Sequence, residues 1–100
     1  MAMSPWKPER DPVILRRMGK TGEEAAELLK VTNRVVIQGI DGIDPASGKS
    51  NRQMLLEETA DLMAQCRINI AYFGLDEAAI QARIATKTAQ MYEWEELVKE

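Results

Sequence analysis

The sequence contains no histidine and a single cysteine, Cys66, among its 100 residues. The absence of histidine excludes a histidine-based nucleophile system, a zinc site with imidazole ligands and a histidine pH switch. A lone cysteine excludes an internal disulfide and fits a reducing, cytoplasmic setting. Because Cys66 falls within a predicted helix, we interpret it as a small core residue and not as a nucleophile.

Long apolar runs and a strong excess of one charge are also missing. No apolar segment approaches the roughly 20 residues of a membrane-spanning helix, and residues 1–10 do not resemble a signal peptide. The formal net charge is −3 without a marked basic stripe, which argues against duplex nucleic acid as the main partner. Hydrophobic residues make up 45% and charged residues 29% of the chain, as in folded soluble proteins. We therefore expect neither a membrane nor a nucleic acid as partner.

No segment alternates apolar and polar residues as a strand would, so the sequence predicts an all-α fold. We expect an N-terminal arm at 1–10 and one domain at 11–100, an antiparallel helical bundle of three long helices plus a short N-terminal helix. Gly19 and Gly22 each cost about 1 kcal/mol relative to alanine in a helix, which predicts a break or kink near them. The expected helices are Pro12–Met18, Thr21–Gln38, Asn51–Phe73 and Glu77–Val98. Their expected caps and stops are Asp11, Gly39, Ser50, Gly74 and Asp76.

Helices of this length leave apolar faces uncovered in so short a chain. The last predicted helix shows this most clearly, because its apolar stripe is interrupted only by one lysine. The stripe consists of Ile80, Ile84, Lys87, Met91, Trp94 and Val98. We therefore expect a homodimer, or a dimer of dimers, that completes the bundle.

Carboxylates occur in two helical segments at a spacing that places them on one face. Glu24 and Glu27 lie three residues apart, as do Glu58 and Asp61, and residues three apart share a helix face. Glu24 and Glu58 also lie in line with apolar residues of their helices. If the two helices pack side by side, four carboxylates converge, which is costly unless cations hold them together.

Two structural interpretations compete with a metal site. A solvated charged face would pair acids with bases four residues on, but the residues at those positions are Leu28, Val31, Leu62 and Gln65. A capping box at Thr21-Gly22-Glu23-Glu24 would explain the first two glutamates, but not Glu27, Glu58 or Asp61. A cluster of oxygen ligands without sulfur or imidazole suits Mg2+, for which Mn2+ commonly substitutes, and not zinc or copper. Di-iron bundle sites need histidine, so they are excluded.

The motif Glu23-Glu24-x-x-Glu27, followed by Glu58-x-x-Asp61, resembles the signature of the MazG-like all-α nucleoside triphosphate pyrophosphohydrolases over roughly residues 20–87. The resemblance implies that Glu24, Glu27, Glu58 and Asp61 are the catalytic metal ligands. It also implies that Glu23 lies outside this ligand set or helps to orient water, and that Lys87 contacts the phosphates. It implies cleavage between the α- and β-phosphates of a (d)NTP, giving a (d)NMP and pyrophosphate. The loop at 40–49 is longer than is usual in this family. The family's asparagine before the lysine and arginine after it are also absent.

Other residues are candidates for substrate binding. Arg83 and Lys20 offer further positive charges, and Asn33 is one of several amides that can bind a base edge. The chain resembles the small phage-type members of the family, some of which act on purine nucleotides such as dGTP, so we expect dGTP or GTP as the substrate. Lys87 has a second interpretation as a salt-bridge partner of the acidic cluster. The alternative to an enzyme is a non-catalytic helical dimer that serves interaction or regulation, in which the carboxylates point outward and bind no metal.

Overall fold

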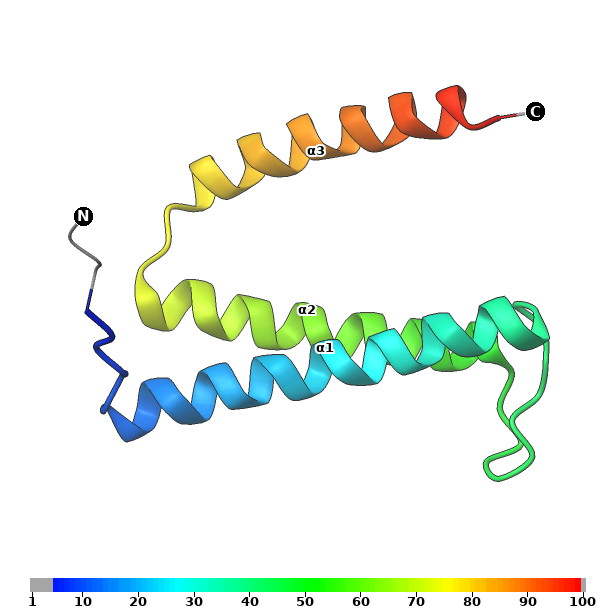
Figure 1. Ribbon diagram of the computed structural model, residues 1–100, viewed down its shortest axis with the longest axis horizontal. Helices are drawn as coiled ribbons and strands as arrows, with labels where there is room; N and C mark the ends of the chain where they lie inside the picture. Colours follow the sequence, from blue (N-terminus) through cyan, green and yellow to red (C-terminus); the bar gives the residue numbers. More distant parts are fainter. Residues whose placement is uncertain (1–4, 100) are drawn as a thin grey trace. The chain divides into compact units, whose positions relative to one another are not determined.

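The computed structural model describes residues 5–99 (Figure 1). Over this range the chain forms three helices, α1 (Pro12–Gln38), α2 (Asn51–Phe73) and α3 (Glu77–Leu97). No strand occurs in the described residues, and the β-type pairing there is an isolated antiparallel bridge between Ile43 and Ser50. The predicted all-α fold class is therefore confirmed.

The predicted short N-terminal helix is wrong, because α1 runs without a break through Gly19 and Gly22. The Thr21 hydroxyl donates to the Arg17 carbonyl at 2.7 Å, so Thr21 lies inside the helix and does not cap it. The competing interpretation of Thr21-Gly22-Glu23-Glu24 as a capping box is therefore wrong as well. Helix formation on both sides outweighs the two glycine penalties of about 1 kcal/mol each.

The predicted starts of α1, α2 and α3 and the predicted end of α1 are confirmed by their cap geometry. The Asp11 carboxylate accepts from the Val13 amide at 2.8 Å, and proline opens α1. The Ser50 hydroxyl accepts from the Gln53 amide at 3.1 Å, and the Asp76 carboxylate accepts from the Ala79 amide at 3.1 Å. Gly39 follows α1 with a φ of 86°, in the left-handed region that favours glycine.

The chain divides into two compact units, residues 1–67 and 68–100. In the first unit, α1 and the first part of α2 form an antiparallel helical hairpin. The second unit contains the end of α2, the turn at Gly74 and α3. Residues 5–10 of the predicted arm have neither helix nor strand, and its residues 1–4 lie outside the described range.

The loop between α1 and α2 is built around two buried polar residues. Asn51 is fully buried and donates to the Gly39 carbonyl at 2.9 Å and to the Gln38 side chain at 3.3 Å. The buried Asp44 carboxylate accepts from the Ser47 hydroxyl at 2.7 Å and pairs with Arg34 at 2.9 Å. These bonds lower the pKa of Asp44, the Ser47 hydroxyl first among them. The loop thus joins the two helices through specific contacts and fixes one end of the hairpin.

Apolar burial is small in the described part of the chain. Among the described apolar side chains, the buried one is Val31 on α1. Many large apolar side chains stay exposed, including Leu29 and Val36 on α1 and Leu56 and Met63 on α2. In the described residues no helix combines the length and apolar character needed to cross a membrane.

Candidate functional site

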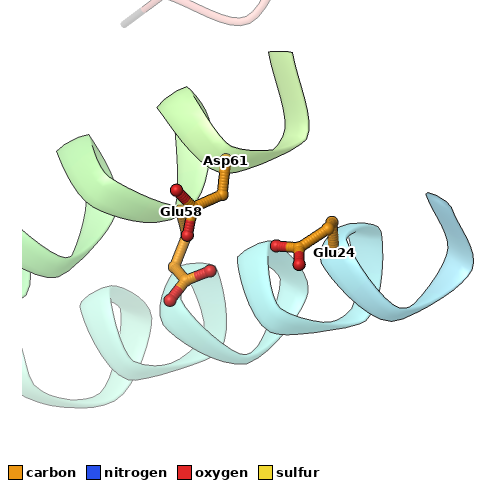
Figure 2. A group of neighbouring side chains, drawn as sticks. All are labelled: Glu24, Glu58 and Asp61. Atoms are coloured by element: carbon orange, nitrogen blue, oxygen red, sulfur yellow. The ribbon is translucent and has the colours of Figure 1, made fainter. Parts of the chain in front are cut away.

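Three carboxylates from the two helices of the hairpin meet at one place (Figure 2). Glu24 comes from α1, and Glu58 and Asp61 come from α2. One carboxylate oxygen from each lies within 4.8 Å of the other two. Figure 2 shows Glu58 extending from α2 toward α1, with the Glu24 carboxylate directed along α1 toward that of Glu58. We call these three residues the carboxylate cluster.

The hairpin explains why the cluster forms. Glu58 and Asp61 share a face of α2 because they are three residues apart, and the antiparallel packing brings this face against the stretch of α1 that contains Glu24. Glu24 and Glu58 are partly buried, whereas Asp61 is exposed. The cluster thus lies at the edge of the helix interface, where it is open to an ion from solvent.

Glu58 shows the strongest electrostatic conflict in the cluster. Burial raises its pKa above the ordinary value, and the negative charges of Asp61, Glu27, Glu24 and Glu57 raise it further. Both effects disfavour the ionised form of a carboxyl group. A divalent cation among these oxygens would remove the conflict, so the raised pKa of Glu58 fits a cation-binding position.

Glu27 is the member of the predicted quartet that does not join the cluster. Its side chain is exposed on α1, and its carboxylate is not one of those that meet within 4.8 Å. Its charge nevertheless acts on Glu58 and helps to raise the pKa of that residue. Glu27 therefore lies near the cluster without being part of it, and its predicted role as a metal ligand stays a prediction.

Lys20 contacts the cluster directly. Its ammonium nitrogen lies 3.1 Å from a Glu24 carboxylate oxygen and 3.4 Å from one of Glu23. The hydrogen bond to Glu24 is the main reason that the pKa of Lys20 is raised, with Glu23 next. The sequence predicted Lys20 as a substrate ligand, and the structure shows it as a partner of the cluster.

The sequence did not predict a second lysine near the cluster. Lys49, in the loop before α2, places its ammonium 2.8 Å from a Glu57 oxygen. Glu57 also accepts from the Gln53 side chain at 2.8 Å, and these bonds, Lys49 first, lower the pKa of Glu57. Helical spacing gives no signal for Lys49, because the residue lies outside a helix.

The other predicted substrate ligands lie on separate elements. Asn33 is exposed on α1, and Arg83 and Lys87 are exposed on α3, which belongs to the second unit. Figure 1 shows α3 as its own helix, joined to the end of α2 by a short connection. The substrate-binding roles of these residues stay predictions.

The donor set of the cluster fits a hard divalent cation. All three donors are carboxylate oxygens, and Mg2+ binds proteins through one or a few carboxylates while it keeps several waters. Asp61, the third donor, is exposed to solvent. Glu24, Glu58 and Asp61 are thus the residues that would hold the ion.

Searches against protein-family models, curated proteins and solved structures find no match to this chain. The geometry of the cluster and the chemistry of its residues are therefore what indicate a function.

Proposed function

We propose that the protein is a Mg2+-dependent (d)NTP pyrophosphohydrolase of the MazG-like type, which cleaves between the α- and β-phosphates. The observation that supports this proposal is the approach of Glu24, Glu58 and Asp61 within 4.8 Å, from two different helices. A cluster of oxygen donors with two partly buried members suits an ion that binds phosphates. The two halves of the MazG-like motif are the segments that supply these donors.

The residues of the chain take distinct roles in this proposal. Glu24, Glu58 and Asp61 hold the cation, which when bound neutralises phosphate charge and lowers the pKa of a coordinated water. Glu27 lies near enough to act on Glu58 but outside the cluster. It is therefore the carboxylate that we propose as acceptor of the proton from the attacking water.

The substrate would be a purine nucleotide such as dGTP or GTP. In this proposal Lys87, with Arg83, contacts the phosphates, and Asn33 contacts the base. A cytoplasmic setting would supply both the nucleotide and Mg2+, and the reaction would act on nucleotide pools.

A second copy of the chain would complete the helical bundle. Ile84, Met91 and Trp94 on α3 are all more than half exposed, at 51%, 58% and 62%. Covering such side chains stabilises an assembly by about 25 cal/mol for each Å2 of apolar surface removed from water. We therefore propose a homodimer, or a dimer of dimers, as the active form.

The deciding experiment measures pyrophosphate release from a panel of dNTPs and NTPs with Mg2+ or Mn2+. The wild type is compared with Glu58→Gln and with Glu93→Gln, which makes the same chemical change at an exposed carboxylate on α3. We expect Glu58→Gln to reduce kcat/KM at least about 100-fold, since several kcal/mol of charge stabilisation is lost. Glu93→Gln should keep wild-type turnover.

Calorimetry with Mn2+ in the absence of nucleotide separates the enzyme from the interaction module. An enzyme of this type binds Mn2+ and loses that binding in Glu58→Gln. If no nucleotide is hydrolysed in a metal-dependent way, the proposal is wrong. If the protein also binds no Mn2+, the non-catalytic module is favoured.

A further inference from the structure

We propose that the outer face of α1 pairs antiparallel with the same face of a second copy of the chain. The inference goes beyond the proposed function, because it depends on neither the metal nor the nucleotide. It adds a contact distinct from the α3 stripe, as a dimer of dimers requires. We call this surface the α1 face, and it consists of Leu15, Gly22, Ala26, Leu29, Val36 and Ile37.

The large side chains of the α1 face are apolar and mostly exposed. Their exposed fractions are 51% for Leu15, 60% for Leu29, 86% for Val36 and 80% for Ile37. The helical repeat places them on the side of α1 opposite the buried Val31, which faces α2. A contiguous exposed apolar face of this kind marks an interaction surface.

The α1 face is complementary to itself when two copies run antiparallel. Leu15, Gly22, Leu29 and Val36 are spaced by seven residues, so they form one row along the helix. A twofold pairing that sets Gly22 of each copy opposite Leu29 of the other also brings Leu15 opposite Val36. Among the described residues, a Cβ at Gly22 would meet no atom within 4 Å. The pairing fills this space with a leucine side chain and leaves the small Ala26 near the twofold axis.

The charges beside this row fit the antiparallel direction. Glu23 and Lys30 follow Gly22 and Leu29 by one residue, so both lie on the same flank of the row. In the antiparallel pairing, Glu23 of each copy lies about 3 Å along the helix axis from Lys30 of the other. Glu23 also pairs with Lys20 at 3.4 Å, but its side chain is 62% exposed and open to a second cation. Opposite charges at the rim of an interface fix its register.

A second copy of α1 is the occupant that these features favour. The twofold axis uses the pairing of a small with a large residue twice, and it uses the pairing of Glu23 with Lys30 twice. A parallel pair would instead set Gly22 against Gly22 and place the flanking charges on opposite sides. The antiparallel homodimer therefore accounts for the apolar row and for the charges together.

The first test is sedimentation velocity of the full chain carrying Leu29→Glu, with Leu56→Glu as the matched control. Leu56 is a leucine of similar exposure, 62%, but it lies on α2. Both changes are made together with Met91→Glu, which disrupts the contact through the α3 stripe. We expect the Met91→Glu chain to dimerise. Leu29→Glu should weaken this dimer at least about tenfold, because a charge would be buried in an apolar contact. Leu56→Glu should leave the dimer unchanged.

A mixing experiment tests the antiparallel direction. In the Met91→Glu chain, Glu23→Lys and Lys30→Glu each place like charges across the pair. Each variant alone should therefore dimerise about five- to tenfold more weakly than the Met91→Glu chain. An equal mixture of the two variants restores both pairs of opposite charges, so it should dimerise as tightly as the Met91→Glu chain. A variant that is weakened by misfolding would not recover in the mixture.

The outcomes separate this contact from the other proposals. If Met91→Glu sediments as a monomer while the wild type assembles, the α1 face is wrong and the assembly through the α3 stripe stands. If Leu29→Glu changes nothing, or Leu56→Glu weakens the dimer equally, the α1 face is not covered by a second copy. A mixture that dimerises no more tightly than its components overturns the antiparallel pairing. The proposed hydrolase is judged separately, by pyrophosphate release.

Discussion

At the scale of single residues, Glu57 and Glu58 show how neighbours in sequence acquire opposite electrostatic properties. Glu57 bonds to Lys49 and Gln53, and its pKa is lowered. Glu58 turns toward the other carboxylates, and its burial together with their charges raises its pKa. Ionised Glu57 therefore stabilises the fold, whereas ionised Glu58 destabilises it in the absence of metal.

This difference gives a pH-dependent prediction for Glu58→Gln. Because the folded-state pKa of Glu58 is raised, its ionised form costs stability above that pKa, and the cost disappears as the pH falls through it. In EDTA at pH 7, we expect Glu58→Gln to be more stable than wild type, with the advantage shrinking as the pH is lowered. Urea unfolding at pH 7 and at successively lower pH values measures this change.

Glu57→Gln is a control in which we expect the stability to change in the opposite direction. Because the folded-state pKa of Glu57 is lowered, its ionised carboxylate adds stability above the unfolded-state pKa of about 4.3. This stability is lost as the pH falls through the folded-state pKa. Glu57→Gln should therefore be less stable than wild type at pH 7. If Glu58→Gln is also less stable than wild type at pH 7 without metal, the assigned conflict at Glu58 is wrong.

The sequence predicted most of the cluster but not the ion pair that lies next to it. Glu24, Glu58 and Asp61 could be found because carboxylates at a spacing of three share a helix face. That rule cannot tell which rotamer a side chain adopts, so it did not separate Glu27 from the other three. It also gives no information about loops, and the contact between Lys49 and Glu57 spans eight residues from loop to helix.

At the scale of elements, the unbroken α1 shows local propensity outweighed by its surroundings. Gly19 and Gly22 predicted a break, yet neither has a positive φ. The Asp11 cap and the Lys20–Glu24 pair at a spacing of four stabilise the helix around them. Helix ends were predictable from cap residues, whereas continuity depends on the sum of many small terms.

Gly19→Ala should therefore stabilise the protein. A Cβ at Gly19 would meet no atom within 4 Å, and alanine is better than glycine in a helix interior by about 1 kcal/mol. We expect the free energy of unfolding to rise by about this amount. Gly48→Ala should lower it by about 1–2 kcal/mol, because Gly48 has a φ of 75°. Chemical denaturation of both variants tests this, and a destabilised Gly19→Ala would show that α1 is strained there.

At the scale of the whole molecule, the small amount of apolar burial is the reason for proposing an assembly. Ordering about 100 residues costs on the order of 100 kcal/mol or more of conformational entropy, and hydrophobic burial is the main term that offsets it. Among the described residues, Val31 is the one apolar side chain that is buried. Helical periodicity predicted the apolar stripe of α3, but it does not identify the surface that covers the stripe.

The proposed homo-oligomer predicts that stability depends on protein concentration. Assembly that buries the α3 stripe raises the midpoint of thermal unfolding as the concentration increases. In Trp6→Phe, Trp94 is the remaining tryptophan of the two in the chain, so its fluorescence reports on the stripe. We expect its emission to shift to shorter wavelength on assembly, in step with sedimentation velocity.

Met91→Glu and Gln90→Glu test which face of α3 is used. Met91 lies in the apolar stripe and is 58% exposed, and Gln90 is its exposed polar neighbour. A charge at position 91 would have to be buried without a partner, so we expect the assembly to weaken by at least about tenfold, as measured by the dissociation constant in sedimentation. Gln90→Glu should assemble as wild type does.

A wild-type chain that sediments as a monomer, with an unfolding midpoint independent of concentration, would contradict the proposed assembly. Equal weakening by both variants would place the interface elsewhere than on the stripe.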